Sequence, residues 1–332
     1  MNIRIAGPAD RPAIIELLRQ SLGESTVPKS EALWSWKHEQ NPFGQSYVLL
    51  AEENGTLIGL RAFMQWDWQW QGKRYKAIRA VDTATHPAHQ GKGIFKKLTL
   101  QQAEACKQCG VQFVFNTPNT QSKPGYLKMG WVEQGKMPLK FKIVQPFAMS
   151  YSMVFNKKKV STYKDDPTPH VNWPEAIFQR IDKAAVSDDH LSTAVSGAYI
   201  KWRYADNPLA NYNYITDNEN FLAILRLKEH FFGKELRISD FILLNKEASP
   251  KKVGLQIKRS VAEYARKHNV RFISLSGQQY QQYRPYFGWM GMVPVRSLGP
   301  IVTLKDLNMN SHFPQLLDVN NWAYSLGDME LF

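Results

Sequence analysis

Apolar and polar positions alternate with two different periods along the first 145 residues. A period near 3.6 follows Asp10 and recurs over 94–108, which predicts two amphipathic helices. Alternation with a period of two predicts strands over 47–51, 57–70 and 75–85, the first two joined by a turn at Asn54-Gly55. Shorter apolar runs predict strands at 3–6, 111–116 and within 130–144. This mixture of strands and helices predicts the α/β (α+β) fold class.

A set of short motifs recurs in the same order about halfway along the chain. The spacing between the matched pairs shrinks slowly, as expected when one copy of a duplicated fold loses loop residues. We therefore expect two tandem domains, at 1–145 and 196–332, joined by a polar linker at 146–195 with a helix near 174–185. The matches pair Trp36-Lys37 with Trp202-Arg203, Asn41-Pro42 with Asn207-Pro208, Tyr47 with Tyr212, Gly72-Lys73 with Gly233-Lys234, Asp82 with Asp240, and Gly130-Trp131 with Gly288-Trp289.

Composition narrows the class of protein. The chain has 332 residues, of which 43% are hydrophobic, with two cysteines and a formal net charge of +13. Two cysteines exclude a disulfide-stapled secreted scaffold, and without a long apolar run or a signal peptide the expected location is cytoplasmic. The basic excess suits an anionic cofactor, an acidic substrate or nucleic acid about equally. Clustered basic residues interleaved with exposed aromatics are not evident, which disfavours nucleic acid.

The loop that precedes the second predicted helix carries the most informative chemistry. Glycines at 91 and 93 allow a close backbone approach, so the N–H groups of Gly91, Lys92, Gly93, Ile94 and Phe95 can converge on an anion. The start of a helix adds unpaired N–H groups and the positive end of its dipole. The segment therefore predicts a pyrophosphate cradle, although it matches neither the nucleotide-hydrolase P-loop nor the dinucleotide fingerprint.

The run from Thr85 to Ile94 resembles the acyl-CoA-binding motif of the GCN5-related N-acetyltransferase (GNAT) superfamily. Gln90 and Gly93 fill the family pattern Gln/Arg-x-x-Gly-x-Gly/Ala, whereas Phe95 is bulkier than the small residue that usually ends it. The resemblance covers residues 1–145 and implies, for each copy, a mixed, mostly antiparallel sheet flanked by helices. It also implies acetyl-CoA as cosubstrate and no metal.

The resemblance also implies roles for residues outside the loop. Tyr126 matches the tyrosine of the family motif Tyr-x-x-x-Gly-Phe, which protonates the leaving CoA thiolate. The alternative role for Tyr126 is that of a tyrosine packed in the core. The backbone of Ala84 and Thr85 would hold the pantetheine arm like an added strand. Asn116 and Asn119 stand where the family places an amide that contacts this arm, and turn formation beside Pro118 is their alternative.

The general base is less clear from the sequence. Asp82 lies on the strand before the loop, and no other acidic residue occurs between Asp67 and Glu104. It is therefore a candidate for accepting the proton of the attacking amine. Because Asp240 matches it in the second copy, a structural carboxylate is the alternative.

The second copy has lost the loop. Gln90-Gly91-Lys92-Gly93 aligns with Ser249-Pro250-Lys251-Lys252, and Pro250 has no N–H to offer a phosphate. Tyr126 aligns with Arg284. We expect only the first copy to bind acyl-CoA, while the second completes the acceptor pocket or acts as a built-in dimer partner.

Two weaker patterns have ordinary explanations as well as functional ones. Cys106 and Cys109 form a lone pair at a helix end, which suits packing better than zinc or redox chemistry. Trp66, Trp68 and Trp70 share one strand face, which indicates a core or, alternatively, a pocket for a sugar ring.

The expected function is N-acetyl transfer from acetyl-CoA to an amine by direct attack. The Trp face favours an amino sugar among the small amines. Alternatives are a non-catalytic CoA-binding or scaffold protein and a basic nucleic-acid binder. The expected assembly is a monomer with pseudo-dimeric domains, or a homodimer.

Overall fold

The computed structural model describes residues 1–23, 28–155, 171–184, 189–295 and 298–329, so that part of the expected linker, 156–170, lies outside the described residues. These residues form two compact units. The first is built mainly from Met1–Gly135 and Pro300–Asn321, and the second mainly from Lys136–Gly299 and the segment that begins at Trp322.

The first unit is organised around one mixed sheet. β4 runs parallel to β5, whereas β1–β2, β2–β3, β3–β4 and β5–β14 pair antiparallel, which confirms the expected mostly antiparallel sheet. Its strand order is β1 (Asn2–Ile5), β2 (Tyr47–Glu53), β3 (Thr56–Trp70), β4 (Lys73–Thr85), β5 (Phe113–Asn116), β14 (Ile301–Asp306) and β6 (Val132–Lys136).

Helices cover both faces of this sheet because neighbouring strand residues point to opposite sides. On one face α1 (Arg11–Leu22) packs on Leu50, Leu60 and Ala84. On the other face α3 (Ile94–Gln108) packs on Leu49, Ala51 and Ile58. The remaining helices of this unit are α2 (Glu31–His38), α4 (Lys123–Lys128) and α11 (Phe313–Leu316).

The second unit has a sheet of the same design. β9, β10 and β11 pair antiparallel, β11 runs parallel to β12, and β12 pairs antiparallel with β7. One side is covered by α8 (Pro250–Lys267), whose Val253, Ile257 and Val261 are buried in the core. The order is β13 (Val293–Val295), β7 (Leu139–Ile143), β12 (Phe272–Ser276), β11 (Gly233–Leu243), β10 (Phe221–His230) and β9 (Tyr212–Thr216).

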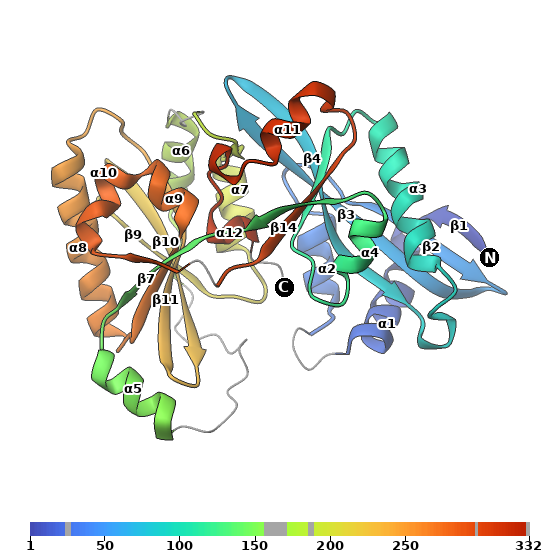
Figure 1. Cartoon of the computed structure of the whole chain (residues 1–332), viewed down its shortest axis with the longest axis horizontal. Helices are drawn as coiled ribbons and strands as arrows, with labels where there is room; N and C mark the ends of the chain where they lie inside the picture. Colours follow the sequence, from blue (N-terminus) through green and yellow to red (C-terminus); the bar gives the residue numbers. More distant parts are fainter. Residues whose placement is uncertain (24–27, 156–170, 185–188, 296–297, 330–332) are drawn as a thin grey trace. The chain divides into compact units, whose positions relative to one another are not determined.

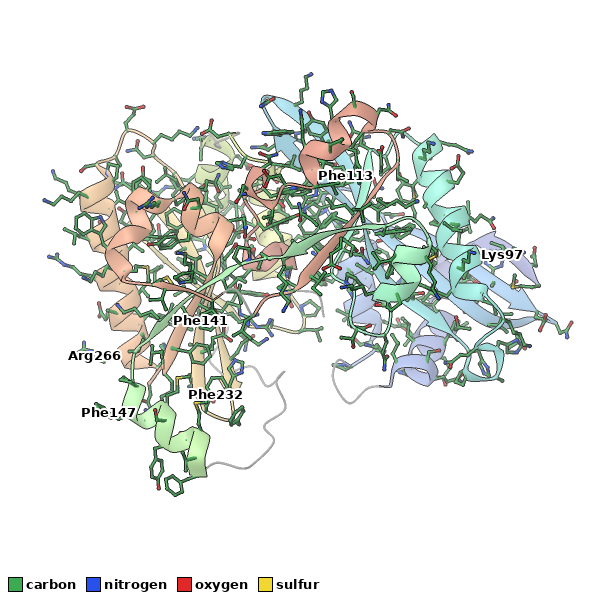
Figure 2. All side chains as sticks on the ribbon, in the orientation of Figure 1. Lys97, Phe113, Phe141, Phe147, Phe232 and Arg266 are labelled. Carbon is green, nitrogen blue, oxygen red and sulfur yellow. The ribbon has the colours of Figure 1, made fainter. Side chains whose placement is uncertain are left out.

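Shorter elements complete the second unit. α5 (Pro146–Phe155) and α6 (Glu175–Lys183) lie in the segment expected as a linker with some helix. Phe147, labelled in Figure 2, is on α5 and is exposed. The others are β8 (Ser192–Thr193), α7 (Gly197–Ile200), α9 (Gly277–Gln282), α10 (Arg284–Phe287) and α12 (Leu326–Met329).

Each sheet includes at least one strand from the other half of the chain. β14, which comes late in the chain, pairs with β5 of the first sheet, with Thr303 opposite Asn116. β7, which comes from the first half, pairs with β12 of the second sheet. In Figure 1 the red strand β14 accordingly belongs with the blue and cyan strands, and the green strand β7 with the yellow and orange ones. Both sheets are therefore completed by residues distant in sequence.

Candidate active site

The site of the first unit begins where two parallel strands separate. β4 and β5 are paired only over Ala77–Arg79 and Phe113–Phe115, so the later part of β4 has no partner on that side among the described strands. Just beyond the paired segment β4 contains a bulge, in which Val81 and Asp82 together oppose Ala62 of β3. Bulges commonly redirect a strand next to an active site, and here the bulge coincides with the opening.

A cavity of about 960 Å³ occupies this opening. Pockets of this size are large enough to enclose most of a cofactor or drug-sized ligand. Lys92, of the loop, is not among the residues that line it. The other predicted site residues all line this one cavity, namely Asp82, Ala84, Thr85, Gln90, Gly91, Gly93, Ile94, Phe95, Asn116, Asn119 and Tyr126.

The glycine loop has the backbone that an anion cradle requires. Gly91 and Gly93 have φ values of +78° and +75°, in the left-handed region that glycine adopts without strain. Open space surrounds the position of a Cβ at either residue, so nothing in the protein blocks the approach of a ligand. Gly93 is the N-cap of α3, so the free N–H groups of the first helical turn face the same region.

Tyr126 reaches the cavity from α4 and is otherwise buried, with 4% of its surface exposed. Its ring packs edge-on against Phe95, with ring centroids 5.5 Å apart, and tilts against Trp131 at 5.2 Å. Gly125 allows this approach, because a Cβ there would lie 3.2 Å from the Phe95 ring. The bulky Phe95 therefore fixes the tyrosine ring, a role that the family motif did not indicate.

The hydroxyl of Tyr126 has a charged neighbour that the sequence analysis did not identify. Nη1 of Arg61, on β3, donates a hydrogen bond to the tyrosine oxygen at 2.8 Å. The Arg61 side chain is completely buried. A single arginine within the apolar run of β3 was the signal in the sequence that could have indicated it.

The two asparagines differ in what their side chains do. Asn116 is buried at the end of β5, and its Oδ1 accepts a hydrogen bond from Thr303 Oγ1 at 2.5 Å. Asn119 Oδ1 accepts hydrogen bonds from the backbone N–H of Gln121 and Ser122 and from the Ser122 hydroxyl. These hydrogen bonds form the turn that was the alternative role expected for Asn119.

Asp82 is part of a buried polar cluster with two residues of α2. Its Oδ2 lies 3.0 Å from Lys37 Nζ and 2.8 Å from His38 Nε2. Burial alone would raise the pKa of Asp82, but the Lys37 ammonium and the His38 N–H together hold it well below its usual range. Burial lowers the pKa of His38, so its neutral ring can donate to Asp82 while Nδ1 lies 2.9 Å from the Ser46 hydroxyl.

These contacts make Asp82 a weak proton acceptor, because its charge already serves as the counter-ion of Lys37. Its assignment as general base stays a prediction. Lys37 and His38 were not predicted as site residues, although Trp36-Lys37 and Asp82 both belong to the motifs that recur as Trp202-Arg203 and Asp240.

The corresponding place in the second unit is nearly filled. Only about 50 Å³ remains there, and this space is lined by strand β11 beyond Ile238, by Ser192 and Thr193, and by Ala323, Ser325 and Asp328. Asp240 accepts a hydrogen bond from Tyr204 at 2.8 Å, just as Asp82 does from His38. Burial and the nearby Asp328 carboxylate raise the pKa of Asp240 to about 7.

The weaker patterns of the sequence have structural explanations. Trp66, Trp68 and Trp70 are buried, and the first two pack edge-on against Phe115, so they do not form an open sugar platform. Cys106 is a buried free thiol.

Within the described ranges no group of three or more His, Cys, Asp or Glu side chains could hold a metal ion. The helices among these residues are too short or too polar to cross a membrane.

Comparisons with known proteins agree with this geometry. Residues 2–133 match the family model described as an acetyltransferase (GNAT) domain. An L-methionine sulfoximine/L-methionine sulfone acetyltransferase of Salmonella typhimurium is 30% identical over 148 residues, which are 42% of this chain and 84% of that protein. The L-amino acid N-acyltransferase MnaT of Escherichia coli is 28% identical over 148 residues, 42% of this chain and 83% of that protein.

A solved structure extends the similarity of fold beyond the first unit. The GCN5-related N-acetyltransferase from Anabaena variabilis superposes with a TM-score of 0.60 at 13% identity, covering 93% of this chain and 74% of that one. The matched domain and its relatives identify the chemistry, and this superposition concerns the fold alone. The chain belongs to the GNAT family and is an N-acetyltransferase.

Proposed function

We propose that the first unit transfers an acetyl group from acetyl-CoA to the amine of a small acceptor of the amino-acid class. The observation that carries this proposal is the convergence of the glycine loop, the start of α3, the unpaired part of β4 and Tyr126 on one cavity of about 960 Å³. Each of these features suits a different part of an acyl-CoA. Their presence around one cavity supports a single extended ligand.

The cofactor would interact with the site mainly through the backbone. The loop N–H groups of Gly91 and Gly93 and the first turn of α3 suit the pyrophosphate, with Lys96 at the cavity wall. Ala84 and Thr85 offer a strand edge with no partner strand among the described residues, along which the pantetheine amides can add as a further strand. An N–H of this edge would also polarise the thioester carbonyl.

The chemical step would be a direct attack of the amine nitrogen on the thioester carbon. The C–N bond forms, the C–S bond breaks, and Tyr126 gives its hydroxyl proton to the departing thiolate. The amine proton leaves to a base or to water. Asn116 and Asn119 remain proposed contacts of the pantetheine arm, through the parts of their amides that the bonds described above do not occupy.

The acceptor is proposed from the relatives and not from the aromatic face of β3. Both relatives are named for amino acids or their analogues. The burial of Trp66 and Trp68 removes the reason for favouring an amino sugar. An amine next to a carboxylate is therefore the acceptor chemistry to test first.

A binding assay followed by an acceptor panel tests the proposal. Acetyl-CoA should stabilise the protein against thermal unfolding, by about 2.7 kcal/mol at a hundred times its Kd. Release of free thiol should then be fastest with methionine sulfone, methionine sulfoximine or other L-amino acids. Full stabilisation with turnover only on glucosamine or an aminoglycoside would overturn the acceptor class. Failure of acetyl-CoA to bind would overturn the whole proposal.

Gly91→Val should weaken acetyl-CoA binding by about tenfold or more, because a β-branched residue cannot adopt φ near +78° without moving the N–H groups of the cradle. Gly55→Val is the matched control. Gly55 has φ of +77° and open space around it, but it lies in the β2–β3 turn outside the cavity lining. Calorimetry on both variants measures the difference. Equal affinities would show that the cradle is misassigned.

We also expect one acetyl-CoA to bind per chain. The equivalent opening in the second unit retains only about 50 Å³, and its helix α8 begins at Pro250, which lacks an N–H. Calorimetric titration should therefore give a stoichiometry near one. Two equivalent sites per chain would contradict the assignment of cofactor binding to the first unit alone.

A further inference from the structure

Arg61 is a buried cation that has no counter-ion among the residues that the structure describes. Its side chain is completely inaccessible to solvent, yet its Nε and Nη2 have no hydrogen-bond partner among the described residues. Within the described ranges, the hydrogen bond of its side chain is the 2.8 Å bond from Nη1 to the Tyr126 hydroxyl. No carboxylate in the described part of the chain pairs with it. Buried charges are otherwise paired or bound to a ligand, so this arrangement requires an explanation.

Aromatic rings compensate for part of the desolvation. The guanidinium carbon lies 4.4 Å from the centroid of Phe63, 5.5 Å from that of Tyr126 and 5.9 Å from that of Phe95. Cation–π contacts of this kind favour the charged form inside a protein. They hold the guanidinium in place without neutralising it, so its positive charge remains directed at the tyrosine oxygen.

The direction of the hydrogen bond matters for the chemistry. Because arginine has only donors, the Tyr126 oxygen must be the acceptor in this pair. The hydroxyl hydrogen of Tyr126 is thus not used in the contact with Arg61. Tyr126 lines the cavity, so this hydrogen is available to a group that enters there.

We propose that Arg61 is a positioning residue for acyl transfer, which orients the Tyr126 hydroxyl towards the leaving sulfur and supplies the counter-charge when that hydroxyl has given up its proton. This inference rests on the proposed function, in which Tyr126 protonates the thiolate. When the C–S bond breaks, the sulfur takes the hydroxyl proton and the tyrosine becomes a phenolate. The ion pair that Arg61 lacks in the resting enzyme then forms. Water returns the proton to Tyr126 before the next turnover.

Arg61→Met tests this role, since methionine keeps a long flexible side chain and removes the charge. It should lower kcat by about 10- to 100-fold, the value of a hydrogen bond to a charged group. The Kd for acetyl-CoA should stay within about twofold, because Arg61 does not line the cavity. Thermal stability should be unchanged or higher, since an unpaired buried charge is removed. Arg61→Lys should restore part of kcat.

A double-mutant cycle with Tyr126→Phe separates this role from a structural one. If Arg61 acts through the hydroxyl, Arg61→Met should cost almost nothing further in the Tyr126→Phe background. An equal loss of kcat in both backgrounds, or a kcat unaffected by Arg61→Met while Tyr126→Phe is impaired, would overturn the inference and leave the proposed function intact. Full activity of Tyr126→Phe itself would instead overturn the proposed acid on which the inference rests.

Discussion

Replacing Tyr126 with phenylalanine is expected to lower kcat by about 10²- to 10⁴-fold, the usual contribution of a positioned general acid. The ring should stay in place, because Phe95 and Trp131 hold it through ring contacts that do not involve the hydroxyl. The Kd for acetyl-CoA should therefore change little. Single-turnover kinetics with acetyl-CoA in excess, together with calorimetry, would separate the chemical step from binding.

Tyr47→Phe is the matched control for this experiment. Tyr47 packs against the same hydrophobic cluster as Tyr126 but does not line the cavity of about 960 Å³. Loss of its hydroxyl should leave kcat within about twofold of the wild type. A Tyr126→Phe enzyme that turned over as fast as the Tyr47→Phe enzyme would show that the thiolate leaves without help from Tyr126.

Asp82→Ala is expected to lower the free energy of unfolding by about 3–5 kcal/mol at neutral pH, the cost of leaving a buried charge without its partner. The side chains concerned are enclosed, with exposures of 4% for Lys37 and 2% for His38. Urea unfolding at pH 7 measures this change. Adding Lys37→Met to the variant should recover part of the lost free energy of unfolding, since the ammonium that lost Asp82 is then removed as well.

The pH dependence of the Asp82→Ala variant should show that its loss of stability comes from the ionised Asp82 carboxylate. The pKa of Asp82 is lowered in the folded protein, so its contribution to stability is complete above the unfolded value of about 3.9 and disappears as the pH falls below it. The difference in the free energy of unfolding between wild type and Asp82→Ala should therefore become smaller in acid. Asp67→Ala, which removes a partly exposed pair with Arg74 at 3.8 Å, should cost no more than about 1 kcal/mol at any pH. Similar losses of unfolding free energy in Asp82→Ala and Asp67→Ala would show that the buried cluster contributes no more to stability than the Asp67–Arg74 pair.

Local pattern was sufficient to predict most of the first unit's elements. The helix at 94–108, the turn at Asn54-Gly55 and the strands around them were predicted because periodicity and turn residues act over a few positions. The cavity-lining residues near the glycine loop were predicted for a similar reason. A strand, a tight loop and a helix start are consecutive in sequence, so they are necessarily close in space.

The exchange of β7 and β14 could not be predicted in this way. Each is a short strand whose alternating side chains would suit the same position in either sheet, so the sequence does not specify which partner it joins. The burial of the Trp face was equally ambiguous, since alternation reveals a shared face but not what covers it. Arg61 was missed because its importance lies in a hydrogen bond to Tyr126, 65 residues away in sequence.

The exchanged strands also determine when the enzyme can fold during its synthesis. β5 ends at Asn116, but its neighbour β14 begins only at Ile301. At about 5–20 residues per second, a ribosome needs on the order of ten seconds or more to make the intervening chain. During that time the edge of β5 that faces away from β4 lacks the strand that will pair with it. That edge stays open to pairing with another chain until residues 301–306 have been made.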